Sequence, residues 1–249
     1  MSAPPWLLLR GLMRETRHWG DFPQRLAEAT QAAVFTLDLP GNGLRSREAS
    51  PNTVGAMAAD IAAQWQRLNG APVRVLALSL GGMVAVEWAR QAPNTVTGLV
   101  LCNTSMRPHG APWQRFSLRA VPSLLRLLVS APDAAVVEAD ILRLTSNRAE
   151  DHAPLVADWA QWRRQCPVAG RNVLRQLTAA ACYRADDAPT VPTRVLCSAS
   201  DRLVSSACSE RLAAAWQVPI AMHPDAGHDL PLDAPDWVIG ELRRASRVD

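Results

Sequence analysis

Short runs of consecutive apolar residues alternate along the chain with longer stretches in which apolar residues recur every three or four positions. The apolar runs cover residues 5–11, 32–39, 72–79, 96–103, 193–200 and 218–224. Continuous apolar runs are typical of parallel strands that are buried on both faces, and the amphipathic stretches between them are typical of crossover helices. The pattern predicts an α/β fold with a doubly wound, mostly parallel sheet of about six strands.

The alternation stops between residues 104 and 188. This segment has no convincing buried strand, and it has helix-period stretches at 113–130, 133–146, 155–166 and 171–183. We therefore expect residues 1–103 and 189–249 to form the sheet domain, and residues 104–188 to form an inserted helical lid. A lid of this kind would cover the carboxyl ends of the strands, where such sheets bind ligands.

Composition narrows the classes of protein that fit this pattern. The formal net charge is only +3, all 26 basic residues are arginines, and they form no basic run interleaved with aromatic residues, so nucleic acid is not expected as a partner. The five cysteines have neither a CxxC nor a metal-ligand spacing, which favours free thiols and no metal site. The apolar run near the N-terminus is too short for a signal peptide or a membrane span, so we expect a cytoplasmic protein.

One serine lies where a predicted strand meets a predicted helix. Ser79 ends the apolar run 72–79, with Ala77 two positions before it and Gly81 two positions after it. Small residues at these positions are typical of a nucleophile elbow, a turn so tight that its serine has a strained backbone. A helix N-cap is the alternative interpretation, because serine is also a favoured capping residue.

Two further residues have the chain order that a serine nucleophile requires. Asp201 follows the strand predicted at 193–200, and His228 follows the strand predicted at 218–224. A serine, an acid and a histidine, each just after a strand, form a catalytic triad when the strand ends converge. Taken alone, Asp201 fits an Asx turn and His228 fits an ordinary loop histidine. His223 and Asp225 are weaker candidates because of their positions, within or just after the last strand.

Acyl transfer also needs hydrogen-bond donors for the oxyanion. The backbone N–H of Leu80, next to Ser79 at the start of a helix, is one expected donor. The N–H of Leu12, in the loop after the first strand, is the other, with Gly11 allowing the turn and Met13 forming a wall of the site.

The chain resembles the α/β-hydrolase superfamily through the segments LRGL…HW, DLPGNG, ALSLGG, SASDRLV and AGHDLP. Its spacing and lid size are similar to those of the pimeloyl-carrier-protein methyl ester esterases and related carboxylesterases. The resemblance implies that Ser79 is the nucleophile, His228 the general base and then acid, and Asp201 the residue that orients the imidazole. It implies no cofactor.

The sequence departs from the family pattern in two places. Arg10 stands where the family usually has a histidine before the glycine of the oxyanion loop, so a different contact must hold this loop. Arg10 has two interpretations: a structural partner of a local acid such as Glu15, or a contact for a substrate carboxylate. The antiparallel hairpin that often opens the fold is not expected, because only a few residues precede the first strand.

The lid sequence indicates the substrate less clearly. Aromatic residues that could line an acyl pocket, with the leucines of SLLRLLVS, are Trp113, Phe116, Trp159 and Trp162, or they could form the core of the lid itself. The lid has eleven arginines and eight acidic residues, so it could dock an acyl carrier protein or the phosphates of coenzyme A, or these charges could simply be solvated.

The sequence thus predicts a serine hydrolase of carboxylic esters with small to medium acyl groups, which works through an acyl-enzyme. Thioesterases and C–C bond hydrolases or lyases use the same triad and remain alternatives. A ligand-binding protein on a hydrolase scaffold is the alternative of another class.

Overall fold

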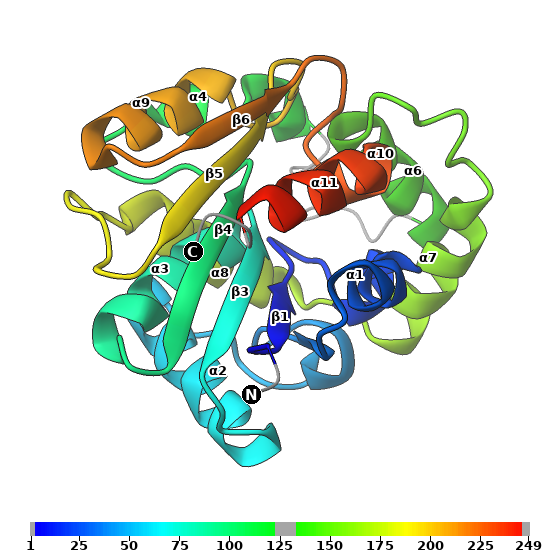
Figure 1. The fold of residues 1–249 in the computed structure, drawn as a ribbon. Coiled ribbons are helices and arrows are strands. Elements are labelled where there is room, and N and C mark those ends of the chain that lie inside the picture. The colour runs from blue at the N-terminus through cyan, green and yellow to red at the C-terminus, as the bar shows by residue number, and fades with distance from the viewer. Residues whose placement is uncertain (1–2, 123–132, 246–249) are drawn as a thin grey trace.

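Six parallel strands form the centre of the structure, a computed structural model that describes residues 3–122 and 133–245. Their spatial order is β2-β1-β3-β4-β5-β6, and helices lie on both faces of the sheet (Figure 1). The strands are β1 (Trp6–Leu9), β2 (Val34–Leu37), β3 (Val73–Leu78), β4 (Val96–Cys102), β5 (Thr193–Ser198) and β6 (Ile220–His223). The predicted doubly wound α/β fold is confirmed.

The strand order reverses between β1 and β3. The chain passes from β1 outward to β2, then returns to the other side of β1 and continues outward to β6. Leu9 at the end of β1 pairs with Ala77 near the end of β3, so the loops that follow these two strands begin side by side. Ligands of open α/β sheets bind at such a reversal, outside the carboxyl ends of the strands.

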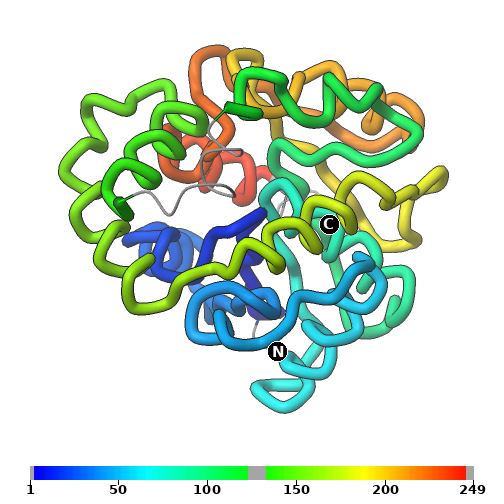
Figure 2. Tube along the Cα trace, turned by 180° about the vertical axis from the view of Figure 1, so that it is seen from behind, coloured from blue at the N-terminus to red at the C-terminus, as the bar shows by residue number. Residues whose placement is uncertain are grey.

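Two apolar cores, one on each face, hold the helices to the sheet. On one face, α1 (Phe22–Thr30) and α11 (Pro235–Ala245) pack together on the sheet. The other face is covered by α2 (Val54–Leu68), α3 (Leu80–Gln91) and α9 (Ser206–Trp216). Figure 2 shows this second face, with α8 (Gly170–Cys182) running across it. Each central strand is therefore buried on both sides, which accounts for its continuous apolar run.

The helices α1 and α2 differ in how their first turns are capped. Asp21 precedes α1, but its side chain makes no capping hydrogen bond, and its own backbone is already helical. Thr53 does cap α2, because its hydroxyl accepts a hydrogen bond from the backbone N–H of Ala56 at 3.2 Å. Three shorter helices lie in the loops: η1 (Thr16–Trp19), η2 (Gly43–Arg45) and α10 (Leu230–Asp233).

The segment between β4 and β5 is helical in the residues that the structure describes. It contains α4 (Pro112–Arg115), η3 (Leu118–Ala120), α6 (Ala134–Thr145), α7 (Leu155–Gln165) and α8, and α6 packs against α7. The leucines of SLLRLLVS, at 124, 125, 127 and 128, lie outside the described residues. Within the described ranges, no helix has the length and apolar character needed to cross a membrane.

Candidate active site

Ser79 lies in a strained turn between β3 and α3. Its φ of 56° and ψ of −120° are rare for a residue with a side chain, and its N–H donates to the carbonyl of Cys102 at 3.0 Å. The turn is tight, since a Cβ on Gly81 would lie 2.7 Å from the carbonyl oxygens of Leu9 and Arg10. Ser79 occupies the N-cap position of α3, but its side chain makes no capping hydrogen bond. The geometry is that of a nucleophile elbow.

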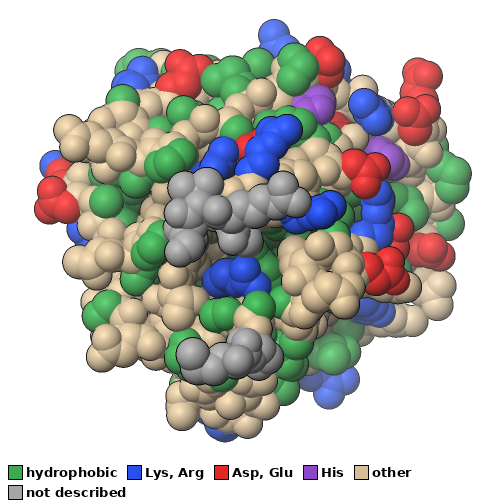
Figure 3. All heavy atoms as spheres, in the orientation of Figure 1, with side chains coloured by type: hydrophobic (Ala, Val, Ile, Leu, Met, Phe, Trp, Pro, Cys, Tyr) green, Lys and Arg blue, Asp and Glu red, His purple; other side chains and the backbone are tan. Residues whose placement is uncertain are grey.

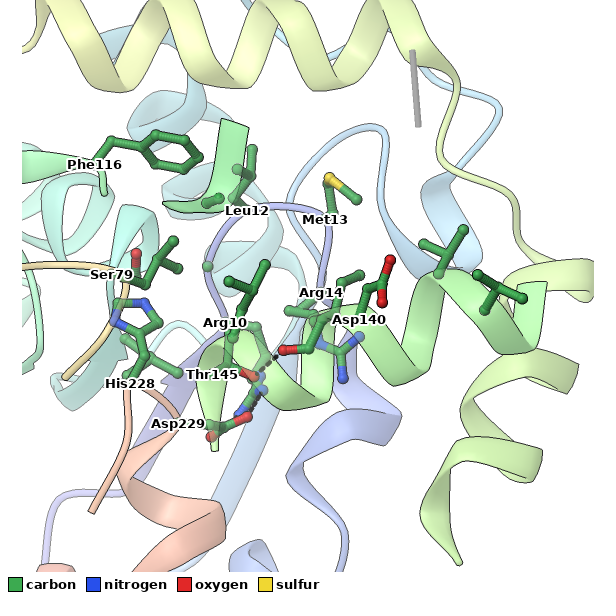
Figure 4. A pocket seen from close by; sticks show the side chains of 18 residues that line it. Arg10, Leu12, Met13, Arg14, Ser79, Phe116, Asp140, Thr145, His228 and Asp229 are labelled. Atoms are coloured by element: carbon green, nitrogen blue, oxygen red, sulfur yellow. Dashed lines mark hydrogen bonds and ion pairs between the residues drawn. The ribbon is translucent and has the colours of Figure 1, made fainter. Parts of the chain in front are cut away.

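Asp201 and His228 form a buried pair at the ends of β5 and β6. Asp201 Oδ2 lies 2.7 Å from His228 Nδ1, and the two side chains are 1% and 6% exposed. The other carboxylate oxygen of Asp201 accepts the backbone N–H groups of Leu203 and Val204, at 2.7 and 2.9 Å. Asp201 therefore forms the Asx turn that was the alternative interpretation, and it also contacts the histidine. His228 and Ser79 line the same pocket (Figure 4).

Contacts that were not predicted from the sequence hold the loop that carries His228. The Asn103 side chain donates to the carbonyls of Gly227 and His228, at 3.2 and 2.8 Å. The same side chain accepts the N–H of Ser198 at 2.9 Å, so it joins the ends of β4 and β5 to this loop. Asp233 accepts the N–H of Gly227 at 2.7 Å. Asn103 directly follows a strand, which was the available signal for a functional position.

The weaker histidine candidate has a structural role in the same region. His223 ends β6, and its Nδ1 accepts the backbone N–H groups of Asp225 and Ala226 at 3.2 and 3.0 Å. Asp225 is exposed to solvent. Neither residue is among those that line the pocket with Ser79.

The loop after β1, residues 10 to 14 and hereafter the β1 loop, faces Ser79 from the neighbouring strand. In the described part of the chain, the N–H groups of Leu12 and Leu80 have no hydrogen-bond acceptor, so both are available to a ligand oxygen. Met13 has a left-handed backbone, with φ of 59°, and its N–H donates to the side chain of Gln176 on α8 at 3.1 Å. Gln176 in turn donates to Asn42, which donates to the carbonyl of Arg14. This buried network fixes the backbone of the β1 loop.

Arg10 is paired with Asp229, rather than with Glu15 as the sequence suggested. Its two terminal nitrogens contact the two oxygens of Asp229 at 3.0 and 2.5 Å, and both side chains are buried. Burial alone would raise the pKa of Asp229, but the charge and hydrogen bonds of Arg10 outweigh it and hold that pKa below its ordinary value. Glu15 pairs instead with Arg17. Asp229, which the sequence suggests to be only a neighbour of His228 or a turn residue, lines the pocket together with Arg10.

A second buried ion-pair cluster lies behind the β1 loop. Glu138 on α6 accepts hydrogen bonds from Arg14 at 2.5 Å and from Arg163 on α7 at 2.6 Å. Burial lowers the pKa of Arg14, although the Glu138 charge opposes this shift. Burial, together with the positive charges of Arg14 and Arg10, lowers the pKa of His18 well below its ordinary value and so favours the neutral imidazole. These contacts attach the β1 loop to α6 and α7.

A pocket of about 120 Å³ joins these groups and is lined mainly by apolar side chains. One face of α6 forms its long wall, through residues spaced by helical turns: Val136, Val137, Asp140, Ile141, Leu144 and Thr145. Ser79 and His228 lie at one end of the pocket, and Met13, Arg14 and Asp140 lie toward the other (Figure 4). No cluster of metal-ligating side chains occurs in residues 3–122 and 133–245.

Most of the aromatic residues predicted to line the pocket do not line it. Phe116 lines the pocket, as does Met13. Trp113 is 67% exposed to solvent and does not line the pocket. Trp159 and Trp162 instead contact His18 edge-on, each with a centroid distance of 5.3 Å, because they fill the contact between α7 and η1. Trp159 therefore fits the alternative interpretation as a packing residue, whereas the exposed Trp113 fits neither interpretation.

Comparison of the chain with known proteins identifies its family. The model of the alpha/beta hydrolase family matches residues 6–241. The chain is 28% identical over 217 residues to the "Putative carbamate hydrolase RutD" of Azorhizobium caulinodans, covering 85% of this chain and 79% of that protein.

Solved structures agree with this match. Rv0554 from Mycobacterium tuberculosis is 25% identical, with a TM-score of 0.77 over 98% of this chain and 89% of that one. A thermophilic esterase from Thermogutta terrifontis, 23% identical, shares the fold with a TM-score of 0.78 over 99% of this chain and 90% of that one. Because the family model spans nearly the whole chain, including the elbow and the loops after β5 and β6, this hydrolase belongs to the alpha/beta hydrolase family.

Proposed function

We propose that the protein is a serine hydrolase that cleaves carboxylic esters of small to medium acyl groups through an acyl-enzyme. The observation that carries the proposal is the buried contact of 2.7 Å between Asp201 and His228, because His228 also lines the same pocket as Ser79 on its strained turn. A serine that only caps a helix needs no strained turn, and an ordinary loop histidine needs neither a buried carboxylate partner nor a pocket shared with that serine. The combination of all three features therefore favours a catalytic site.

The proposed mechanism follows from the positions of these groups. Ser79 Oγ attacks the ester carbonyl, and His228 accepts its proton through Nε2, since Nδ1 faces Asp201. The free N–H groups of Leu12 and Leu80 donate to the oxyanion that forms. His228 then protonates the leaving alcohol, and a water molecule, activated by the same histidine, hydrolyses the acyl-enzyme.

The lining of the pocket supports a neutral, apolar acyl group. Arg10 and Arg14 each form an ion pair with a buried carboxylate, that of Asp229 or that of Glu138. The remaining wall, on α6, is mostly aliphatic. An apolar chain gains free energy on entering such a wall, at about 25 cal/mol per Å² of apolar surface removed from water.

Other substrate classes can react at the same triad, so the test must compare them with esters. The name of the RutD relatives raises carbamates as a further substrate class, and thioesters and C–C bonds are open to the same residues. An acyl carrier protein or coenzyme A thioester has less support, because several arginines of the 104–188 segment are engaged, among them Arg163 with Glu138 and Arg184 with Asp186.

The experiment is a kinetic panel of p-nitrophenyl esters with two to ten acyl carbons, matched thioesters and aryl carbamates. We expect kcat/KM to be highest for esters, and Ser79→Ala to lose at least about 1000-fold, as removal of a triad nucleophile does. Ser205→Ala, a serine in the neighbouring loop outside the pocket, serves as the matched control and should keep full activity. Full ester activity in Ser79→Ala would rule out the mechanism, and a preference for carbamates or thioesters would replace the substrate class.

A further inference from the structure

The ion pair between Arg10 and Asp229 occupies a particular place in the chain. Arg10 begins the β1 loop, two residues before the N–H of Leu12, and Asp229 directly follows His228. The two residues are 219 positions apart, so only the fold brings them together. A contact between them therefore joins the segment proposed to bind the oxyanion to the segment that carries the proposed base.

Both side chains are held from several directions. Arg10 makes two parallel contacts with Asp229, and its Cζ lies 4.7 Å from the centre of the Trp19 ring. The backbone N–H of Asp229 donates to the carbonyl of Thr145, the last residue of α6, at 2.8 Å. Figure 4 shows the pair on the lower side of the pocket in that view, with Thr145 beside it. The pair thus fixes the β1 loop and the histidine loop, residues 225 to 229, against the wall helix.

A contribution to stability alone does not account for a pair in this position. Removing two charges from water costs several kcal/mol per ion, and a buried ion pair is often no more stabilising than apolar residues of the same volume. What the bidentate geometry does supply is a defined distance and orientation between two backbone segments. Those two segments carry groups whose mutual geometry decides the rate of acyl transfer.

A direct contact to a substrate carboxylate does not fit Arg10 either. Both of its terminal nitrogens are engaged by Asp229, and the side chain is only 3% exposed. The remaining nitrogen, Nε, is buried and has no accessible surface from which to meet a ligand.

We propose that Arg10 and Asp229 are positioning residues, which hold the Leu12 N–H and His228 in the relative placement that acyl transfer on Ser79 requires. The proposal rests on the proposed serine hydrolase function. It assigns a role to the arginine that stands where related chains usually have histidine, and to a carboxylate that touches no reacting atom.

The test compares Arg10→Met, Asp229→Asn, their double variant and Arg10→Lys on the best ester, at equal active-site titre. We expect each single variant to lower kcat/KM by about 100-fold, the loss typical of a displacement of about 1 Å, mainly through kcat. The kcat/KM of the double variant should be no lower than that of the less active single variant, because the two residues act as a unit. Arg10→Lys, which keeps the charge and one contact, should recover part of the activity.

A second measurement separates positioning from general loss of structure. A trifluoromethyl ketone with the same acyl chain adds to Ser79 and mimics the tetrahedral intermediate, whereas the matching amide binds without reacting. In Arg10→Met, the ketone should lose affinity in parallel with kcat/KM, while the amide should bind as in the wild type.

Arg45→Met is the matched control, since Arg45 makes a bidentate pair with Asp60 at 2.5 and 2.9 Å outside the pocket. It should leave both inhibitor affinities unchanged. Wild-type kinetics in Arg10→Met, or equal losses for ketone and amide, would overturn the proposal. If the wild type itself forms no ketone adduct, the serine hydrolase function is wrong and this proposal fails with it.

Discussion

At the scale of single residues, the role of a side chain could be predicted from the sequence when its contacts are local, and could not when its partner lies far along the chain. Ser79 and Gly81 were predictable, because the elbow is a local turn whose steric demands act over two residues. Asp229 was not, since its partner Arg10 lies 219 positions away and nothing near either residue indicates the other. Local geometry is readable from short motifs, whereas a long-range pair needs the fold.

Asp38, in the DLPGNG segment, gives a test at this scale. Burial outweighs two backbone hydrogen bonds, from Thr16 and Leu44, and raises the pKa of Asp38 from 3.8 to about 6. The native state therefore binds this proton more tightly than the unfolded chain, so the contribution of Asp38 to stability is present below pH 4 and is lost as the pH rises to about 6. The loss is of the order of 3 kcal/mol.

We expect Asp38→Asn to remove this pH dependence. Denaturant unfolding between pH 4 and 7 should show the wild type losing stability relative to the variant as the pH rises. Asp60→Asn is the control. Arg45 outweighs burial and lowers the pKa of Asp60, so the contribution of Asp60 to stability changes with pH only below about pH 4. Parallel curves for wild type and Asp38→Asn from pH 4 to 7 would contradict the assignment.

At the scale of elements, the strands were predictable and the pocket wall was not. Each central strand is buried on both faces, which produces a continuous apolar run that few other structural elements show. A helix such as α6 buries one stripe of residues, and its periodicity does not say whether that stripe faces a neighbouring helix or a cavity. The structure assigns the face with Val137 and Ile141 to the pocket, and assigns Trp159 to the contact between helices.

The wall formed by α6 should set the acyl chain length. Val137 lies eight residues before Thr145, or about 12 Å along the helix, and is therefore far from the reacting groups. Val137→Phe should shorten the pocket and lower kcat/KM for long esters by about 10-fold or more relative to acetate esters, since each methylene contributes about 1 to 3 kcal/mol of discrimination. Leu174→Phe, at an exposed position of α8, should leave the chain-length profile unchanged. An unaltered profile in Val137→Phe would show that the acyl chain lies elsewhere.

At the scale of the whole molecule, the fold specifies where a reaction occurs and much less about what reacts. The reversal of strand order places the loops after β1 and β3 together, and the outer strands bring Asp201 and His228 to the same edge. On the face that Figure 3 draws, both basic and acidic side chains reach the surface. Family membership supports hydrolysis, and in the proposed reaction the choice of acyl group depends on a pocket formed largely by α6 and the β1 loop.

The most direct test of the account is to locate the covalent adduct formed by a fluorophosphonate. After reaction with the native protein, peptide mass spectrometry should find one modified residue, Ser79, and the label should be absent from Ser79→Ala and strongly reduced in His228→Ala. Labelling at another residue, or of Ser79→Ala at the wild-type rate, would contradict the assignment of Ser79 as the nucleophile.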